Sequence, residues 1–202
     1  MTRRPTWLLV LLLPLATAGL VALSSRAQAQ DASVLKPPQG ASLALVVFQD
    51  LECPRCSRDH PLLQEAARTY KIPLVQYDFP LPGHSWAFDA AVITRYFDAQ
   101  SKKLGEEYRD YIFQHQGEVT KDNLRSVSEK FAAEHHTALG FVVDPQGKFA
   151  AAVRADQELG ERVGIRHTPT IYLVTNNRKG PPFVEVVDSS QLFQMIDSLK
   201  NE

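Results

Sequence analysis

The most constraining feature of the sequence is a Cys-Pro-Arg-Cys motif that follows an apolar run. Residues 43–48 (Leu-Ala-Leu-Val-Val-Phe) have the composition of a buried strand, and Cys53 and Cys56 open a predicted helix shortly after it. Unpaired backbone N–H groups and the positive end of the helix dipole favour a thiolate on Cys53. Cys56 lies one turn into the helix, close enough to form a disulfide with Cys53. The motif therefore predicts a redox site.

These two residues are the only cysteines of the 202-residue chain. One pair cannot form the disulfide framework that holds small secreted domains together. We therefore expect the domain to be stabilised by packing, which leaves both thiols available for chemistry.

Residues 1–29 have the pattern of an export signal. Arg3 and Arg4 form a positively charged start, residues 7–23 are almost wholly apolar, and Ala-Gln-Ala at 27–29 provides a small-residue cleavage site. We expect cleavage after residue 29 and a domain that works in the periplasm or another extracytoplasmic compartment. In an oxidising compartment a dithiol takes part in disulfide chemistry.

The alternative is an uncleaved membrane anchor formed by residues 7–23. Pro14 and Gly19 interrupt this run, and it falls short of the roughly 20 apolar residues that a spanning helix needs. Cleavage is therefore the favoured interpretation.

The remaining chain has the size of one domain. Residues 30–41 are predicted to be a flexible lead-in, and residues 42–202 a single domain with a full-sized core. Without the three arginines of the signal, 19 basic residues face 23 acidic ones, a net charge of −4. No basic run is present, so nucleic acid is not an expected partner. The protein is also expected to be a monomer.

The expected elements begin with a strand, a helix and a strand. The helix runs from Cys53 to about Tyr70 with a kink at Pro61, and residues 74–79 alternate as a second strand. This order predicts a right-handed parallel unit. A helical block follows at about residues 84–140.

The helical block contains three predicted helices. Ser85 is expected to cap the first, which ends near Ala99, residues 104–115 form the second, and Thr120 is expected to cap the third. Tyr108, Tyr111 and Ile112 fall on one face of the second helix, which predicts a core stripe.

The C-terminal part is expected to return to strands. Asp144 and Pro145 can start a helix that ends near Val163, with a hairpin at 144–148 as the alternative for its first half. Further expected elements are strands at 170–174 and 183–187, a turn at 176–182, and a last helix capped by Asp188 with Gln191.

The order of elements and four motifs resemble the DsbA-like thiol-disulfide oxidoreductases of bacterial envelopes. The motifs are Phe48-x-Asp50-x-x-Cys53-Pro54-Arg55-Cys56, Pro61 within the helix, Pro80-Leu81-Pro82-Gly83-His84, and Gly164 to Thr170 (Gly-Ile-Arg-His-Thr-Pro-Thr). The resemblance covers nearly all of residues 42–200. It implies an α/β fold of the thioredoxin type with an inserted helical subdomain.

The Thr168-Pro169 pair precedes a predicted strand. A proline there removes one ladder donor, and a cis bond would turn the backbone of residue 168 toward the cysteines. The resemblance implies that this bond is cis and that residue 168 pairs with the backbone of a bound substrate. The alternative is an ordinary trans bond at the start of a strand.

The expected chemistry is thiol-disulfide exchange. A substrate thiolate attacks Cys53 to form a mixed disulfide, and a second substrate thiol resolves it. Helix geometry and Arg55 are expected to stabilise the Cys53 anion, whereas the adjacent Glu52 should oppose it. No cofactor beyond the Cys53–Cys56 disulfide is expected.

The residues around the cysteines do not decide how protons reach and leave the two thiols. Related folds often bury an acid six residues before the first cysteine, but Val47 occupies that position. Asp50 is a possible substitute, with a loop or capping role as the favoured alternative. His84 and His167 could each donate to a thiolate, or be partly exposed loop histidines.

His135 and His136 are expected at a helix end. Scattered histidines and two cysteines could also bind zinc, but no second C-x-x-C or spaced histidine pair follows, so no metal site is expected.

Three functions compete at this point. The first is an oxidase that donates disulfides to exported proteins with free thiols and is recharged by a membrane quinone-linked thiol oxidase of DsbB or VKOR type, a partner that the resemblance implies. The second is a reductase or isomerase on the same fold. The third is a binding or chaperone module with a static disulfide.

Overall fold

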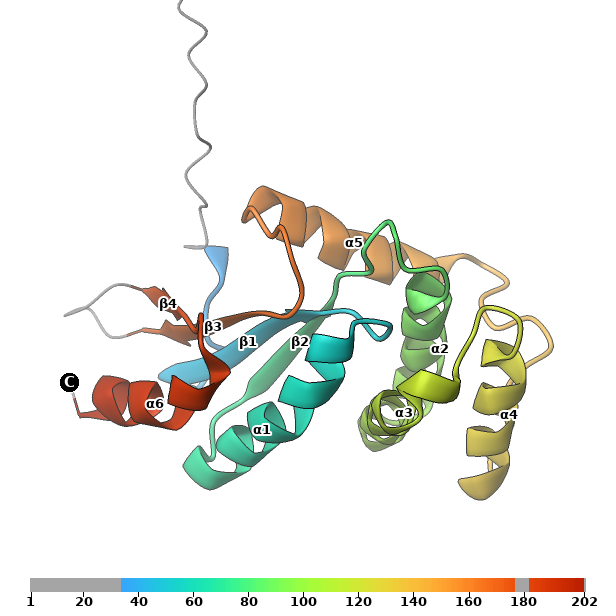
Figure 1. The fold of residues 1–202 in the computed structure, drawn as a ribbon, viewed down its shortest axis with the longest axis horizontal. Helices are drawn as coiled ribbons and strands as arrows, with labels where there is room; N and C mark the ends of the chain where they lie inside the picture. Colours follow the sequence, from blue (N-terminus) through green and yellow to red (C-terminus); the bar gives the residue numbers. More distant parts are fainter. Residues whose placement is uncertain (1–33, 177–181, 202) are drawn as a thin grey trace, which may run out of the picture.

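The computed structural model describes residues 34–176 and 182–201. Within these residues four strands form one sheet in the order β2-β1-β3-β4 (Figure 1). β1 (Leu43–Gln49) pairs in parallel with β2 (Leu74–Asp78) and antiparallel with β3 (Thr170–Thr175), and β3 pairs antiparallel with β4 (Phe183–Glu185). The parallel pair joined through α1 (Pro54–Tyr70) confirms the predicted strand-helix-strand unit.

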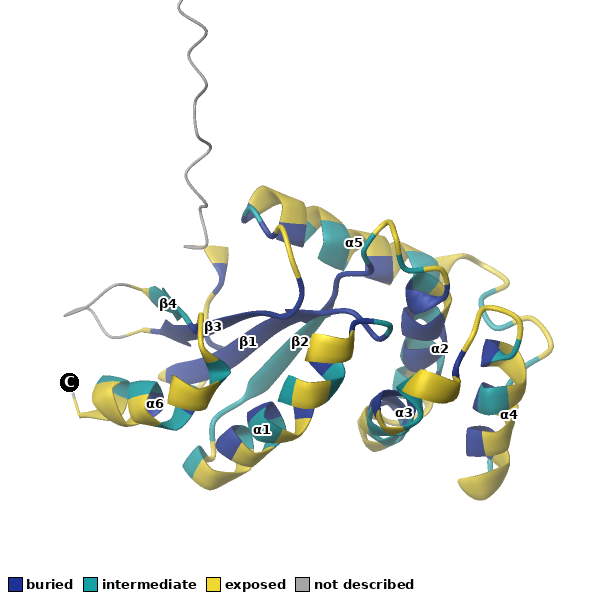
Figure 2. Cartoon of the chain, in the orientation of Figure 1, coloured by how far each residue is buried: buried dark blue, intermediate teal, exposed yellow. Residues whose placement is uncertain are grey.

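β1 is buried along its whole length because helices cover both faces of the sheet (Figure 2). Side chains of a strand point alternately to opposite faces. Leu43, Leu45 and Val47 pack against α1 and α6 (Leu192–Lys200), whereas Ala44, Val46 and Phe48 share a cluster with Leu159 and Val163 at the end of α5 (Lys148–Arg162).

Three helices and a short turn form the insertion between β2 and α5. They are α2 (Ala87–Gln100), α3 (Lys102–Gln114), the 3₁₀ turn η2 (Gln116–Glu118) and α4 (Leu124–Glu134). Figure 1 shows them beyond the β2 edge of the sheet. The predicted thioredoxin-like fold with a helical insertion is therefore confirmed.

The insertion has an aromatic core of its own. The rings of Phe97, Tyr108 and Phe131 contact one another with centroids 4.8–5.1 Å apart, and all three side chains are fully buried. The Tyr108 hydroxyl is 2.6 Å from the Ser128 hydroxyl, so its polar end is satisfied. The core role predicted for Tyr108 and Ile112 is confirmed, and Tyr111 packs against the same cluster.

A buried ionic network joins the insertion to the sheet. Asp78 at the end of β2 pairs with Arg109 of α3 at 2.7 Å and with Arg95 of α2 at 2.6 Å. Arg95 also contacts Asp156 of α5, which accepts the backbone N–H of Asp78. Because Asp78 and Arg109 are both buried, removing either partner would leave an uncompensated charge.

Two helices of the insertion begin later than their expected caps. α2 begins at Ala87, so Ser85 is not its cap. Thr120 and Asn123 exchange hydrogen bonds between side chains and backbone N–H groups, and α4 begins at Leu124. A short turn, rather than a single capping hydroxyl, precedes α4.

The start predicted for the next helix is also wrong. α5 begins at Lys148 after Gly147, which adopts the left-handed conformation with φ 68°. Asp144 instead accepts the backbone N–H of Ala150 from outside the helix. Residues 144–147 form a turn, and the alternative hairpin is not observed.

At the C-terminal end β3 extends to Thr175 and β4 ends at Glu185. Residues 177–181 of the predicted turn lie outside the described residues, as do residues 1–33 with the predicted signal. Asp188 caps the 3₁₀ turn η3 (Ser189–Gln191) by accepting the Ser190 N–H, and α6 begins after it. No helix of the described part of the chain is long and apolar enough to cross a membrane.

We predict that Gly160→Ala destabilises the fold. A Cβ at residue 160 would lie 2.5 Å from the ring of Phe79 and 3.3 Å from that of Phe48. The helix propensity of alanine offers a gain of about 1 kcal/mol, but overpacking this buried contact outweighs it and lowers the free energy of unfolding by about 1–3 kcal/mol. Denaturant unfolding of the wild type and the variant measures the difference.

The matched control is Gly117→Ala, since nothing lies within 4 Å of a Cβ at residue 117. It should leave the free energy of unfolding unchanged or slightly higher. Equal unfolding midpoints for Gly160→Ala and Gly117→Ala would show that the contact between α5 and Phe79 is not tight.

Candidate redox site

Cys53 lies at the start of α1. It is the N-cap residue, and Pro54 takes the first helical position, where the missing N–H costs nothing. The Cys53 N–H donates to the carbonyl of Asp50 at 3.1 Å, which closes a turn between β1 and the helix. The residue is 6% exposed, so it is buried with only a small part open to solvent.

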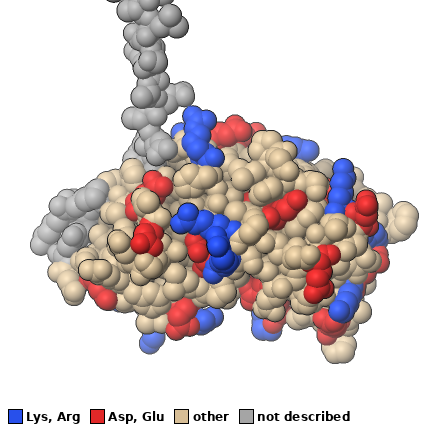
Figure 3. All heavy atoms as spheres, viewed as in Figure 1, with Lys and Arg blue, Asp and Glu red and all other residues tan. Residues whose placement is uncertain are grey.

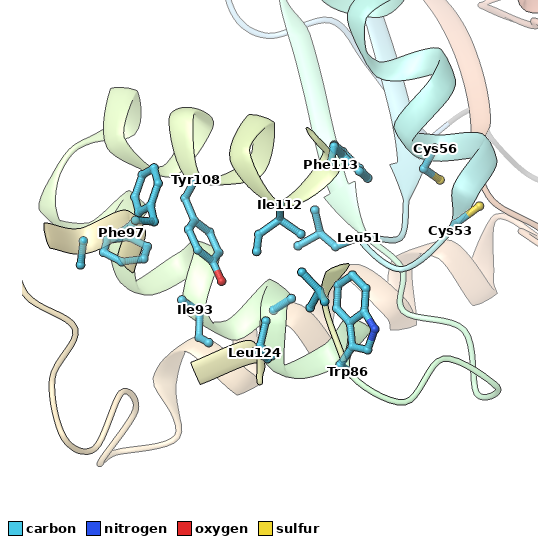
Figure 4. Close-up of a cluster of buried hydrophobic side chains, with 14 residues drawn as sticks. Leu51, Cys53, Cys56, Trp86, Ile93, Phe97, Tyr108, Ile112, Phe113 and Leu124 are labelled. Atoms are coloured by element: carbon cyan, nitrogen blue, oxygen red, sulfur yellow. The ribbon is translucent and has the colours of Figure 1, made fainter. Parts of the chain in front are cut away.

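Cys56 lies one turn into the helix and is 2% exposed. The backbone N–H of Asp50 donates to its sulfur at 3.4 Å. Both cysteines are free thiols in this structure. Figure 4 shows the two sulfurs at the N-terminal end of α1, beside the buried cluster that contains Leu51, Trp86 and Phe113.

The loop before β3 contacts the first cysteine. The Thr168–Pro169 peptide bond is cis, as the family resemblance implies. The Cys53 thiol donates to the carbonyl of Thr168 at 3.3 Å, although the two residues are far apart in the sequence. Cys53 therefore lies between the start of a helix and the backbone that leads into a strand.

The environment gives the two thiols opposite acidities. A hydrogen bond from the Cys56 thiol lowers the pKa of Cys53 to about 5, aided by the backbone N–H groups of Cys56 and Arg55, against the effect of burial. Burial raises the pKa of Cys56 far above its ordinary value, and the neighbouring Cys53 adds to the rise. The pair can therefore hold a thiolate on Cys53 and a thiol on Cys56.

Asp50 has the loop role that the sequence favours for it. Its carboxylate accepts the backbone N–H groups of Glu52 and Leu81, both at 2.7 Å, and is 2.7 Å from Nδ1 of His84. Burial raises the pKa of this carboxyl group. The side chain thus fixes the loop before Cys53, while the backbone N–H contacts Cys56.

Glu52 has a different role from the expected one. Its carboxylate turns away to the start of α2, where it accepts the backbone N–H groups of Trp86 and Ala87 at 2.7 and 3.2 Å. The Ser85 hydroxyl donates to the same carboxylate at 3.4 Å. Glu52 therefore caps α2, and these three donors offset its negative charge.

The other candidate residues lie around the dithiol without a described contact to a sulfur. His84 pairs with Asp50, and Nδ1 of the exposed His167 lies 3.4 Å from the Thr170 hydroxyl. The guanidinium of Arg55 contacts Asp59 and the carbonyl of Val187. Arg55 therefore acts on Cys53 through its backbone N–H.

One residue that sequence reasoning missed fixes the site from the insertion. The amide of Gln116 donates to the carbonyls of Leu51 and Cys53 at 2.7 and 3.1 Å. Nothing in the local sequence around Gln116 indicates this contact, because it depends on the packing of η2 against the start of α1.

His135 is the C-cap residue of α4, at a helix end as predicted, and His136 follows it with φ 54°. Within residues 34–176 and 182–201, no three His, Cys, Asp or Glu side chains are grouped as a metal ion would require.

A family model described as Thioredoxin matches residues 38–190. The chain belongs to the thioredoxin family.

Solved structures of other proteins share the fold of this thioredoxin-family chain. It is similar to α-DsbA1 of Wolbachia pipientis, with a TM-score of 0.64 and 17% identity over 84% of this chain and 95% of that one. It is also similar to a periplasmic thioredoxin-like protein from Salmonella enterica serovar Typhimurium, with a TM-score of 0.64 and 18% identity over 83% and 89% of the two chains. At these identities the likeness shows a common fold.

A curated relative of this thioredoxin-family chain is the Na(+)/H(+) antiporter NhaA 3 of Salinispora tropica. The two are 23% identical over 162 residues, which cover 79% of this chain and 24% of the antiporter. The chain thus spans about a quarter of the length of that relative.

We predict that the reduced protein forms a thiolate with a midpoint near pH 5. Since the pKa of Cys53 is lowered to about 5, the Cys53 sulfur is protonated below that pH and anionic above it. Ultraviolet absorbance of the thiolate, followed while the pH changes, measures the midpoint. Cys56→Ala removes the largest cause of the shift and should raise the pKa of Cys53.

Cys53→Ala is the control, because the pKa of Cys56 is strongly raised and its thiol should not ionise in the same range. A wild-type midpoint at the ordinary thiol value of about 8.5 would contradict the assigned environment of Cys53.

Proposed function

We propose that the chain is an extracytoplasmic thiol-disulfide oxidoreductase that donates disulfides to exported proteins through Cys53 and Cys56. The observation that carries the proposal is the pair of opposite acidities, with the pKa of Cys53 lowered and that of Cys56 raised. A stabilised Cys53 thiolate favours the reduced form of the pair and makes its disulfide a stronger oxidant.

The reaction begins with the oxidised pair. A client thiolate attacks the Cys53 sulfur, the Cys53–Cys56 bond breaks, and Cys56 leaves as a thiolate that takes up a proton. A second client thiolate then attacks the client sulfur of the mixed disulfide, and Cys53 leaves as a thiolate. The client loses two electrons and gains a disulfide, while the pair gains two electrons and becomes a dithiol.

The site offers a bound client a fixed backbone on one side. The segment of Thr168 and Pro169 lies against Cys53, where the carbonyl of Thr168 contacts its sulfur at 3.3 Å. We assign this segment to pairing with the backbone of the client. On the face shown in Figure 3, acidic and basic side chains are interspersed. We therefore do not propose that this face selects clients by their charge.

Two features support an extracytoplasmic location and a membrane thiol oxidase as the recharging partner. The export pattern of residues 1–29 is the first, and the fold likeness to a periplasmic thioredoxin-like protein and to a DsbA is the second. In the proposed cycle a membrane quinone-linked thiol oxidase of DsbB or VKOR type removes the two electrons from the dithiol.

We predict that Cys56→Ala accumulates mixed disulfides with exported proteins. Without Cys56 the thiolate of Cys53 can still attack a client disulfide, but no second thiol of this chain is present to release the client. Non-reducing gels of cells that express the full chain should show bands that disappear with reductant. The matched control, Cys53→Ala, should show none.

The direction of electron flow is tested with purified wild type. The oxidised protein should convert a reduced, unfolded client to its disulfide form in one turnover. Reduction of client disulfides by the dithiol, with no oxidation of reduced clients, would instead identify a reductase. Absence of exchange in both directions would indicate a binding module with a static disulfide.

A further inference from the structure

One buried titratable group near the dithiol has no role in the proposed reaction. His60 of α1 is 3% exposed, and its Nδ1 is buried with no hydrogen-bond partner among the described residues. Its other nitrogen, Nε2, lies 2.6 Å from a carboxylate oxygen of Asp110 on α3. Because a carboxylate accepts, Nε2 carries a proton, and Nδ1 of the neutral ring is a free basic nitrogen.

His60 lies on the same side of α1 as Cys56. The two residues are four positions apart, and both belong to the buried face of the helix. Such residues have Cβ atoms about 5–6 Å apart, and helical side chains tilt toward the N-terminus, here toward Cys56. The His60 ring packs on Phe113 with centroids 4.7 Å apart, and Phe113 belongs to the cluster that contains Cys56 (Figure 4).

His60 and Asp110 also border a hollow that opens to solvent. A hollow of about 210 Å³ between α1 and α3 is lined by Ser57, His60 and Asp110, among others. The Asp110 side chain is 33% exposed. A proton on His60 can therefore be exchanged with solvent through Asp110 and this hollow.

Cys56 requires such a path because its raised pKa makes a bare thiolate costly. Asp50, the other buried acid near it, already accepts two backbone N–H groups and pairs with His84. Other charged groups near His60 are paired with one another, Arg55 with Asp59 on α1 and Arg109 of α3 with Asp78. Among the described residues, Nδ1 of His60 is thus a basic nitrogen without a hydrogen-bond partner on the buried side of α1.

We propose that His60, paired with Asp110, is the proton relay of Cys56. In the oxidised protein His60 is the imidazolium. When a client attacks Cys53 and the disulfide breaks, His60 gives its Nδ1 proton to the departing Cys56 sulfur, directly or through one water, and becomes the neutral ring. When Cys56 later attacks during recharging, Nδ1 takes that proton back and Asp110 stabilises the resulting imidazolium. This inference rests on the proposed function.

The test is the rate at which dithiothreitol reduces the oxidised full-length protein between pH 5 and pH 9. Rates are corrected for the thiolate fraction of the reagent, and the thiols are alkylated after an acid quench. The corrected wild-type rate should depend on pH, because a proton passes to Cys56 in the measured step. His60→Gln keeps a donor for Asp110 but has no proton to give to Cys56, so its rate should be about 100-fold lower than that of the wild type and should lose this dependence on pH.

His135→Gln is the matched control, since His135 also pairs with a carboxylate, Glu107, but belongs to α4. Its profile should equal that of the wild type. Asp110→Asn removes the carboxylate charge and changes no residue of α1. The asparagine oxygen can still accept from Gln64 of α1, which donates to Asp110 at 2.6 Å. This variant should reproduce the loss even where His60→Gln folds poorly, as judged by circular dichroism.

Two results overturn different statements. Profiles of His60→Gln and Asp110→Asn that match the wild type would overturn the relay and leave the proposed function intact. A wild-type protein whose disulfide does not react with dithiothreitol would overturn the proposed function itself.

Discussion

The site depends on holding a negative charge on Cys53 while Cys56 stays protonated. The Cys56 thiol donates to Cys53, and backbone N–H groups at the start of α1 point toward the same sulfur. Cys56 is deeper, and burial keeps it neutral. The two thiols thus differ in acidity because Cys53 lies at the N-terminus of α1 and Cys56 lies one turn further into the helix.

The thioredoxin-like part of the chain and the helical insertion both hold the loop that carries Cys53. Asp50 ties this loop to the segment after β2 by accepting the Leu81 N–H. Glu52 ties it to the insertion by capping α2, and Gln116 reaches back from η2 to the Cys53 carbonyl. The insertion is therefore a structural support of the redox site as well as a cover for one edge of the sheet.

The fold class, the strands and the dithiol could be predicted because they depend on local patterns. A continuous apolar run marks β1, and the Cys-Pro-Arg-Cys spacing marks the start of α1. The start of α2 could not be predicted, since its cap, Glu52, lies 34 residues upstream of Trp86. His60 was missed for a similar reason: only the packing of α3 on α1 shows that one of its nitrogens has a partner and the other has none.

The most direct measurement of the central claim is the reduction potential of the Cys53–Cys56 pair, determined by equilibration with glutathione. A stabilised Cys53 thiolate favours the dithiol, so the account predicts an oxidising value of about −120 to −180 mV, the range of disulfide-donating proteins. A value near −270 mV, which is characteristic of a reducing thioredoxin, would contradict it.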